Sequence, residues 1–344
     1  MACMPPLFMT SWERVKAALR GEEVDRVPVA LWRHFPVEDL QADTLAVAHL
    51  KWQASYNFDL LKLTPRSGYA AEAWGWRATA WYDEYGVARP LDVGVRHAEE
   101  WRRLPVVSPQ HRPLAEQVEA VNLLSTHLRG SVPLVQTVFS PLTIARKLSG
   151  SDFGEQLRGY PDWVEEGLAA IAESTASFAR ACMDAGADGI FFATQLASYR
   201  ELSPEEYARF GRPYDLRVLK AVSGVDLLIL HLHGEDLMFE SLLDYPVNAI
   251  NWHNRRTAPS LEEARSLTGK CLLGGLDERF TLLHGSTAEV EAEAVDAISR
   301  MQARGFILAP GCVLATSTPE ENIRAAVNAA RGTGSLGAGK EGLK

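Results

Sequence analysis

The sequence predicts an α/β protein built as a (β/α)8 barrel, a TIM barrel, with a small insertion after the second strand. Eight short apolar runs alternate along the chain with longer segments of helical pattern. The runs are apolar throughout rather than at every second residue, which indicates strands buried on both faces and therefore a parallel sheet. Eight such units are typical of a barrel. A doubly wound open sheet is the alternative, but no Gly-x-Gly-x-x-Gly follows the first run, which argues against a dinucleotide-binding version.

The expected strands and helices follow one another in the order that a barrel requires. Strands are expected at residues 27–32, 60–63, 134–139, 190–193, 227–231, 247–252, 271–274 and 306–309. Helices are expected at residues 10–19, 44–56, 113–128, 161–185, 204–222, 260–267, 287–304 and 319–331. The first helix begins with the capping box Thr10-Ser-Trp-Glu13, and Pro161 fits the first turn of the long fourth helix.

The stretch from residue 68 to residue 105 departs from this alternation. It is rich in tryptophan and tyrosine and has an alternating β pattern, so we interpret it as an inserted hairpin rather than a second domain. Residues 1–331 are therefore expected to form a single barrel domain. The glycine-rich residues 332–344 are expected to be a flexible tail.

Composition and charge argue against several classes of protein. The 344 residues include 35 basic and 44 acidic residues, for a net charge of −9, and no basic block stands out. Neither nucleic acid nor an anionic membrane is therefore expected as a partner. No run approaches the roughly 18 apolar residues of a membrane span, and residues 1–10 lack the basic leader of a signal peptide. Four widely scattered cysteines are consistent with a reducing cytoplasm.

Two histidines and a cysteine follow the fifth and eighth expected strands. His231 and His233 are two residues apart, so their side chains point to the same side of an extended strand. Cys312 follows the eighth strand, and barrel active sites lie at the carboxyl ends of the strands. Zinc accepts imidazole nitrogen and thiolate sulfur, which predicts a zinc site with His253 and Glu235 as candidates for a fourth ligand. The alternative is that the histidines are hydrogen-bonded core residues and Cys312 a small buried hydrophobe.

Other polar residues lie near the same predicted end of the barrel. The candidates are Arg33 and His34 as catalytic residues, and Arg33, Glu72, Asn251, Trp252 and Asp277 as substrate-binding residues. Arg33 is the best candidate for contact with an anion. A rim salt bridge is the alternative for Arg33, and helix caps or structural hydrogen bonds are the alternatives for Glu72 and Asp277.

Several motifs of the chain are those of a known superfamily. They are Arg14-Val-Lys-Ala-Ala-Leu-Arg-Gly-Glu-Glu-Val-Asp-Arg-Val-Pro28, Ala71-Glu-Ala-Trp-Gly75, Phe139-Ser-Pro-Leu-Thr-Ile-Ala145, Gly186-Ala-Asp-Gly189, Gly274-Gly-Leu-Asp277 and Arg304-Gly-Phe-Ile-Leu-Ala-Pro-Gly-Cys312. With these motifs the chain resembles the uroporphyrinogen decarboxylase superfamily, which also holds zinc-dependent methyltransferases acting on corrinoid proteins or coenzyme thiols. The resemblance extends to about residue 331 and implies a (β/α)8 barrel.

Four substitutions distinguish the chain from the true decarboxylases of that superfamily. Decarboxylases carry Arg-Gln-Ala-Gly-Arg after strand one and Phe-Ser-Asp after strand two, which contact the substrate. Here the two stretches are Arg33-His-Phe-Pro-Val37 and Leu63-Thr-Pro-Arg66. Lys147 stands at a family tyrosine, and Cys312 stands at the histidine of a Gly-His-Gly motif. The resemblance therefore argues against uroporphyrinogen as the substrate.

The methyltransferase branch binds zinc through a His-x-Cys after strand five and a Cys after strand eight. His231 and Cys312 match this pattern, and His233 stands where the first cysteine is expected. The resemblance thus implies a zinc-dependent methyltransferase-like enzyme that moves a methyl group between a corrinoid on a partner protein and a small thiol or similar acceptor.

Two other functions stay open at this point. One is a cofactor-free decarboxylase of uroporphyrinogen or a smaller carboxylate, in which Arg33 contacts the anion and His34 donates a proton. The other is a non-catalytic small-molecule-binding barrel, because a fold does not determine a function. The sequence is also compatible with a homo-oligomer.

Overall fold

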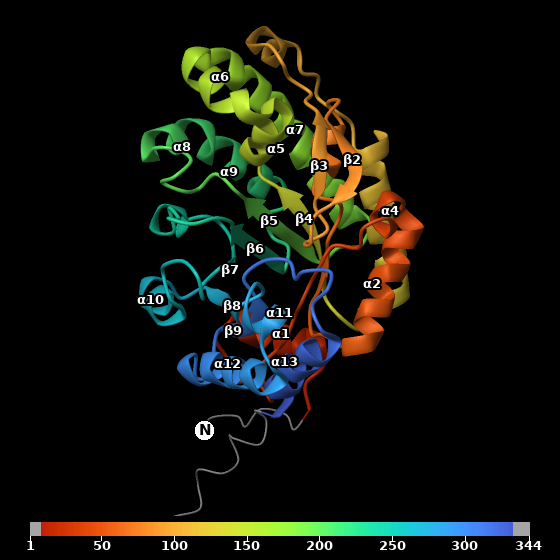
Figure 1. The fold of residues 1–344 in the computed structure, drawn as a ribbon, viewed down its shortest axis with the longest axis vertical. Helices are drawn as coiled ribbons and strands as arrows, with labels where there is room; N and C mark the ends of the chain where they lie inside the picture. The colour runs from red at the N-terminus through yellow and green to blue at the C-terminus, as the bar shows by residue number, and fades with distance from the viewer. Residues whose placement is uncertain (1–7, 333–344) are drawn as a thin grey trace, which may run out of the picture.

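The computed structural model describes residues 8–332, and its centre is a curled parallel sheet with helices packed around its outer side (Figure 1). The sheet has seven strands in the order β1-β4-β5-β6-β7-β8-β9. These strands are β1 Leu61–Leu63, β4 Leu134–Phe139, β5 Gly189–Thr194, β6 Leu227–Leu232, β7 Ala249–Trp252, β8 Cys271–Leu276 and β9 Phe306–Pro310. All neighbouring pairs are parallel, so the carboxyl ends of the strands meet at one edge of the sheet.

Seven of the eight expected strands are thus present, and the first expected strand is not a regular one. Val29 and Leu308 form an isolated parallel bridge. Ala30 N donates to Leu308 O at 3.0 Å, and Asp59 N donates to Val29 O at 2.9 Å. Pro28 has no N–H to donate, and Val29 N donates to the Asp59 carboxylate at 3.0 Å instead of to a backbone carbonyl. A regular ladder therefore does not form at residues 27–32.

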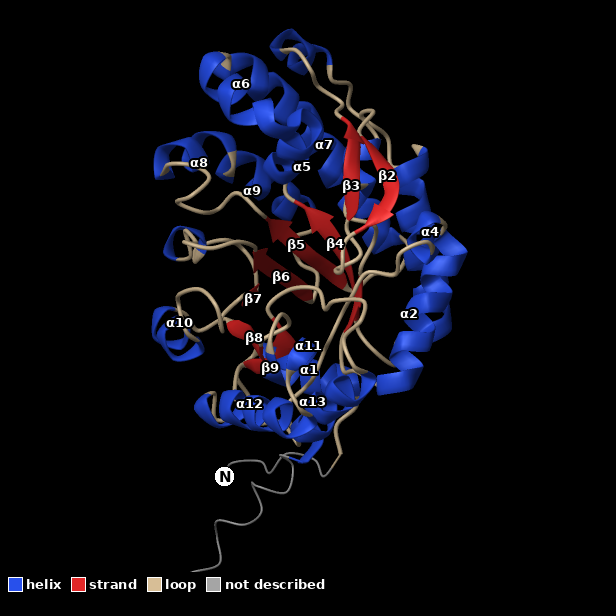
Figure 2. Cartoon of the chain, in the orientation of Figure 1, coloured by secondary structure: helices blue, strands red, loops and turns tan. Residues whose placement is uncertain are grey.

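Helices connect successive strands and cover the outer side of the sheet (Figure 2). The α-helices are α1 Ser11–Leu19, α2 Ala42–Tyr56, α3 Tyr69–Glu72, α4 Arg112–Leu128, α5 Pro141–Ser149, α6 Phe153–Gly159, α7 Pro161–Asp184, α8 Pro204–Phe210, α9 Arg212–Ala221, α10 Leu261–Leu267, α11 Thr281–His284, α12 Thr287–Arg300 and α13 Glu320–Gly332. Short 3-10 turns occur at η1 Glu38–Leu40, η2 Ala98–Arg103, η3 Gly150–Asp152 and η4 Glu240–Leu242.

The eight expected helices are present with one division, and four short helices, α3, α5, α6 and α11, were not expected. The helix expected at residues 204–222 is divided into α8 and α9 at Gly211. Ser140 caps one of these, α5, by accepting a hydrogen bond from Thr143 N at 3.2 Å. The expected tail at residues 332–344 lies outside the described residues except for Gly332, which is the last residue of α13.

The insertion after the second expected strand contains the predicted hairpin. Strand β2 Arg77–Tyr82 pairs with β3 Ala88–Asp92 in antiparallel orientation, and Figure 1 shows the two strands beside α4. Trp74 and Trp76 are buried, whereas Trp81 is 48% exposed beneath the guanidinium of Arg89. Trp101 is also buried, so three of the four tryptophans of the insertion anchor it in the core.

Side-chain alternation divides the interior into two cores. One apolar cluster lies mainly between the sheet and the helices, and a second contains Leu60, Ile229, Ala249 and Ile307. Residues two positions further along the same strands point to the same face, so the polar residues Lys62, His231 and Asn251 continue the second cluster toward the carboxyl ends of the strands. Within residues 8–332, no helix is long and apolar enough to cross a membrane.

Candidate metal centre

Three candidate ligands from two distant parts of the chain converge at the carboxyl edge of the sheet. His231 lies near the end of β6, His233 follows that strand, and Cys312 follows β9. Cys312 Sγ lies 3.8 Å from His231 Nε2 and 3.6 Å from His233 Nδ1. The ligand atoms of the three residues all lie within 4.8 Å of one another. The structure therefore brings together the three residues that the sequence pattern selected.

Asn251 determines which nitrogen of His231 is free to bind an ion. The amide nitrogen of Asn251 donates to Leu273 O at 3.1 Å and to Pro310 O at 3.0 Å. Its amide oxygen must then be the atom 2.7 Å from His231 Nδ1, so Nδ1 carries the proton and donates it. Nε2 consequently presents its lone pair toward Cys312, which is the arrangement that orients metal-binding histidines.

A second pair of residues orients His253 beside the same site. His253 Nδ1 lies 2.7 Å from Glu278 Oε1, and Gly311 N donates to Glu278 Oε2 at 3.1 Å. Burial opposes ionisation of Glu278, but the hydrogen bond and charge of His253 together with backbone N–H groups hold the pKa of that carboxyl below its ordinary value. The carboxylate accepts from Nδ1, and the other ring nitrogen of His253, Nε2, lies 3.3 Å from His233 Nδ1.

Three separations among these atoms are close to those between the ligands of a tetrahedral zinc ion. Zinc binds imidazole nitrogen at about 2.0 Å and thiolate sulfur at about 2.3 Å, so a tetrahedron has N···N edges of about 3.3 Å and N···S edges of about 3.5 Å. The observed His233–His253 separation is 3.3 Å, and the two separations from Cys312 Sγ are 3.6 Å and 3.8 Å. The ligand atoms of His231, His233 and Cys312, all within 4.8 Å of one another, are therefore close to the spacing of zinc ligands.

The protonation states of the ligands are also suited to a metal. Burial lowers the pKa of His231 well below its ordinary value, and burial together with the charge of His253 lowers the pKa of His233 to about 4. Both imidazoles are therefore neutral at neutral pH. Burial and then the nearby Glu278 raise the pKa of the Cys312 thiol to about 11. Metal binding requires the thiolate, so loading the site would release a proton.

The other predicted residues near this edge have structural partners. Asn251 acts on the candidate ligand His231 rather than lining an open surface. Trp252 is completely buried, with its indole N–H donating to Pro259 O at 2.8 Å, so it does not line an open surface. Alternation explains the difference, because Asn251 and its neighbour Trp252 point to opposite faces of β7.

Three acidic candidates are engaged elsewhere. Asp277 Oδ1 accepts from Arg279 N at 2.9 Å and from Phe280 N at 3.1 Å, which is a turn-stabilising role. Glu72 forms a two-oxygen ion pair with Arg66, with its closest contact at 2.7 Å. Glu235, a candidate fourth ligand, is paired with Arg200 and is not among the converging residues.

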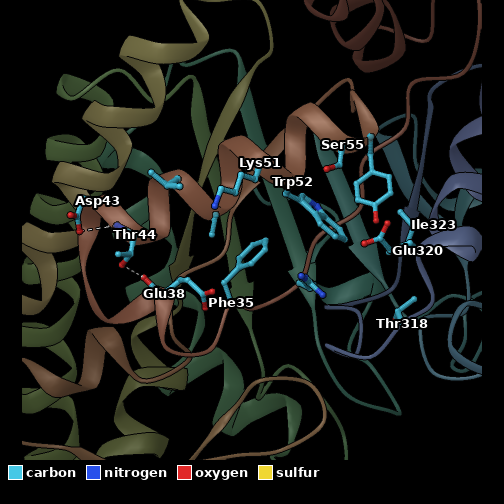
Figure 3. Close-up of a pocket in the computed structure, with 14 residues that line it drawn as sticks. Phe35, Glu38, Asp43, Thr44, Lys51, Trp52, Ser55, Thr318, Glu320 and Ile323 are labelled. Carbon is cyan, nitrogen blue, oxygen red and sulfur yellow. Dashed lines mark hydrogen bonds between the residues drawn. The ribbon is translucent and has the colours of Figure 1, made fainter.

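Arg33 lies in a separate pocket rather than among the candidate ligands. Its guanidinium packs over the rings of Phe35 and Trp52 at 5.1 and 4.9 Å and donates to Thr316 O at 2.9 Å. The pocket has a volume of about 430 Å³, with one wall from α2 and another from the start of α13 (Figure 3). His34, the other predicted catalytic residue, is buried, and burial lowers its pKa to about 3.

Two residues of the site were missed by the sequence reasoning. Glu278 follows Asp277 directly, and its role depends on a contact with Gly311, just after β9, that no local pattern shows. Lys62 had a usable signal, because it is a lone lysine in the apolar run Leu60–Leu63 and is only 5% exposed. A charged residue inside a fully buried strand is rare unless it is paired or functional.

The fold and the site together define a parallel α/β protein with a candidate nitrogen–sulfur metal centre at the carboxyl ends of its strands. The family described as uroporphyrinogen decarboxylase (URO-D) matches residues 10–333, and the chain belongs to this family. This match confirms the resemblance on which the sequence reasoning relied.

Relatives in the family have two named activities. The chain is 26% identical to the methylcobamide:CoM methyltransferase MtaA of Methanosarcina barkeri, over 92% of this chain and 96% of the relative. It is 23% identical to the methylcobamide:CoM methyltransferase MtbA of Methanosarcina acetivorans, over 94% and 98% of the two chains. A uroporphyrinogen decarboxylase of Synechococcus is 24% identical, with 92% of both chains covered.

A solved structure of a similar protein has the same fold as this chain. A methyltransferase from Methanosarcina mazei superposes with a TM-score of 0.83 and covers 94% of this chain and 99% of its own, at 23% identity. The likeness is therefore one of the complete described architecture rather than of a part.

Proposed function

We propose that the protein is a zinc-dependent methyltransferase that moves a methyl group between a corrinoid, carried by a partner protein, and a thiol or similar soft acceptor. The observation that carries the proposal is the convergence of His231, His233 and Cys312, whose ligand atoms all lie within 4.8 Å of one another, with Cys312 Sγ 3.8 and 3.6 Å from the two histidine nitrogens. Relatives named as methylcobamide:CoM methyltransferases support the reaction class.

Each protein group has a defined part in this proposal. His231, held by Asn251, would offer Nε2, and Cys312 would offer Sγ after losing its proton. His233 would offer Nδ1, and His253 would supply the fourth ligand or yield that position to the acceptor. A bound zinc ion supplies Lewis acidity and keeps a thiol deprotonated near neutral pH. Glu278 holds the His253 ring through Nδ1, so that Nε2 lies beside His233 Nδ1.

The surroundings of Arg33 and His34 disfavour the decarboxylase alternative. The Arg33 guanidinium is engaged with two aromatic rings and a carbonyl in the side pocket. A proton donor working near pH 7 needs a pKa near that pH, whereas burial lowers the pKa of His34 to about 3. The two groups assigned to anion contact and proton donation thus lack the properties that those roles require.

Two finer features belong to the same proposal. We infer that residues 27–33, which contact β9 on one side and the approach to β1 on the other, occupy the position of the eighth strand and complete the barrel. The described cysteines Cys182, Cys271 and Cys312 are unpaired, which is compatible with a reducing cytoplasm as the location.

The reaction is tested with zinc-loaded protein, methylcobalamin and 2-mercaptoethanesulfonate. We expect loss of methylcobalamin absorbance together with formation of the methyl thioether, detected by mass spectrometry. Cys312→Ala should abolish both signals. Metal-loaded protein that forms no thioether with this or any other small thiol would contradict the proposal. Decarboxylation of uroporphyrinogen by the metal-free protein would establish the alternative.

A further inference from the structure

The turn of the β2–β3 hairpin, residues 83–87, contacts three segments that are distant from it in the sequence. Thr316 N and Thr316 Oγ1 donate to Glu84 O at 2.8 and 3.0 Å, and the Arg279 guanidinium lies 5.1 Å from the centre of the Tyr85 ring. These contacts come from loops that follow β9 and β8, whereas the hairpin follows β1. Because β1 and β9 are the two end strands of the curled sheet, the hairpin turn connects one end of the sheet to the other.

The third contact of the turn is a close approach to the segment before α2. Gly86 has a φ of +78° and is buried, and a Cβ at this position would lie 2.8 Å from the Cβ of His34 and 2.9 Å from the Cγ of Pro36. Glycine adopts a positive φ without steric cost and has no side chain to collide with these neighbours. The turn therefore fits against this segment because residue 86 is glycine.

Two of the contacted segments carry residues of the candidate metal centre. Thr316 is four residues beyond Cys312, and its carbonyl accepts from Arg33 Nη1 at 2.9 Å while its N–H is bonded to the hairpin. Arg279, which contacts the Tyr85 ring, directly follows Glu278. The hairpin turn is therefore attached to the loop that supplies the candidate thiolate and to the loop whose carboxylate holds His253.

Hydrogen bonds within the turn make it a unit that moves as a whole. Asp83 Oδ1 accepts from Tyr85 N at 3.0 Å and from Val87 N at 2.8 Å. Gly86 N donates to Asp83 O at 3.0 Å, and Asp83 N donates to Val87 O at 3.0 Å. None of these bonds involves the segments that the turn contacts, so the turn keeps its shape when those contacts break.

The strands behind the turn are weakly attached to the rest of the protein. No residue of β2 or β3 is buried, and the pairing of the two strands is irregular between Arg77 and Tyr82. A cavity of about 710 Å³ is lined by residues 77–80 of the hairpin and by Arg112, Pro113 and Glu116 of α4. A two-stranded hairpin is marginally stable by itself. The turn can therefore move away without exposing apolar core.

The burial of the candidate ligands makes such a movement necessary for a large reactant. His231 is 4% exposed, and His233 and Cys312 are partly buried. Group transfer requires the reacting atoms to approach within about 3–3.5 Å. A small thiol is narrow enough to enter a confined site, whereas a corrin macrocycle carried by a partner protein is not.

We propose that residues 83–87 form a latch that closes the candidate metal centre to large reactants and that opens by breaking the contacts with Thr316 and Arg279. The inference rests on the proposed function for the identity of the large reactant, the corrinoid of the partner protein. In the closed state the latch keeps bulk water away from the ligands and holds the loop of Cys312 in place. In the open state the metal centre is accessible to the corrinoid.

Access to Cys312 in metal-free protein tests the latch with two reagents that differ in size. N-ethylmaleimide and fluorescein maleimide carry the same reacting group, and each labelling rate is divided by the rate of the same reagent with glutathione. The protein carries Cys3→Ser, at a position outside the described residues, and Cys182 and Cys271 are completely buried. For the wild-type latch we expect the normalised rate of fluorescein maleimide to be about tenfold lower, because the large reagent reacts from the open state.

Two variants should open the latch, and one matched variant should not. Gly86→Ala places a methyl group against His34 and Pro36 at a positive φ, so the two normalised rates should become equal within about twofold. Tyr85→Ala removes the contact with Arg279 and should act in the same direction. Gly130→Ala is the control, because Gly130 has a φ of +73° but a Cβ there meets nothing within 4 Å. Its rates should equal those of the wild-type latch.

Hydrogen exchange of the Thr316 amide gives a second measurement of the same opening. This N–H donates to Glu84 O, so its exchange, followed by mass spectrometry of peptides covering residues 312–318, should be faster in Gly86→Ala than in the wild-type protein. Faster labelling without faster exchange at Thr316 would assign the effect to a local change beside His34 and overturn the latch.

Two other results would also overturn the latch. One is equal normalised rates of the two reagents in the wild-type protein, and the other is an unchanged rate of fluorescein maleimide in both Gly86→Ala and Tyr85→Ala. These measurements require neither bound metal nor methyl transfer. Failure of the methyl-transfer assay therefore contradicts the proposed function alone, and failure of the labelling experiment contradicts the latch alone.

Discussion

Buried polar groups are hydrogen-bonded to different extents in the C-terminal and N-terminal parts of the molecule. On the side of β6, β7 and β9, Asn251 and Glu278 bond both to an imidazole and to the backbone. Most buried polar atoms without a partner in the described chain lie instead between residues 33 and 136: Arg33 Nε, His34 Nδ1, both carboxylate oxygens of Asp39, Gln53 Oε1, Ser67 Oγ, Trp76 Nε1, Gln117 Oε1 and Gln136 Oε1. The region of β6, β7 and β9 is thus organised before any ligand arrives, whereas residues 33–136 have polar groups available for a ligand.

The largest expected effect is on zinc affinity and comes from removing candidate ligands after β6 and β9. His231→Ala together with Cys312→Ala should lower zinc affinity by more than about 1,000-fold, because two of the candidate metal bonds are lost. Competition with a chromophoric chelator measures the affinity. Glu235→Ala is the matched control, because the Glu235 carboxylate is paired with Arg200. The zinc affinity of this variant should equal that of the wild-type protein. Retention of tight zinc in the double variant would place the metal elsewhere.

In the region of β1, the buried Lys62 should make the free energy of unfolding depend on pH. The pKa of Lys62 is about 7 in the folded protein and about 10.5 in the unfolded chain, so between these values the unfolded chain binds more protons. The free energy of unfolding of the metal-free protein should therefore rise with pH in this window. The cost of burying the charge is nearly complete at pH 7, where Lys62→Met should stabilise the metal-free protein by about 4 kcal/mol.

Chemical denaturation of Lys62→Met at several pH values checks this expectation. The stabilisation should diminish steadily as the pH approaches 10.5, where the lysine is neutral in both states. Lys220→Met, which removes an exposed lysine, should have little effect at any pH. A Lys62→Met variant that is less stable than the wild-type protein at pH 7 would show that the ammonium is already compensated.

The smallest of the three effects concerns the residues that orient the ligands. Asn251→Ala should lower zinc affinity by about 10- to 100-fold without removing a ligand, because His231 loses the acceptor that sets its tautomer. X-ray absorption of the zinc-loaded variant should still show nitrogen and sulfur ligands. An affinity equal to that of the wild-type protein would mean that the ring is held by other contacts, such as its stacking on Phe191.

The sequence predicted most of the fold because the signals are local. Continuous apolar runs located β4 with its observed bounds and the other sheet strands to within about two residues. The first strand was overpredicted because its pattern is as apolar as the others, and the deciding contact comes from Asp59, 30 residues away. No local pattern reports that a distant carboxylate takes a strand's N–H group.

The candidate site was predictable to the extent that it depends on strand ends. His231, His233 and Cys312 follow strands that had to be parallel, so their convergence could be expected. The orientation of the Arg33 side chain and the contacts of Glu278 depend on packing between segments distant in sequence. The spacing of residues along the chain does not predict such packing. Trp252 shows the same limit on a smaller scale, since one residue of register separates a core side chain from one beside the candidate ligands.

The hydrogen bonds of Asn251 have a consequence for cooperativity. One side chain on β7 is bonded to His231 on β6, to the β8 carbonyl of Leu273 and to the β9 carbonyl of Pro310. Opening any of these strands would disturb the His231 ring. The amide hydrogens of β6, β7, β8 and β9 should therefore exchange with solvent as one unit. An ion bound there would slow that exchange in all four strands together, and retention of the ion would report the integrity of the sheet.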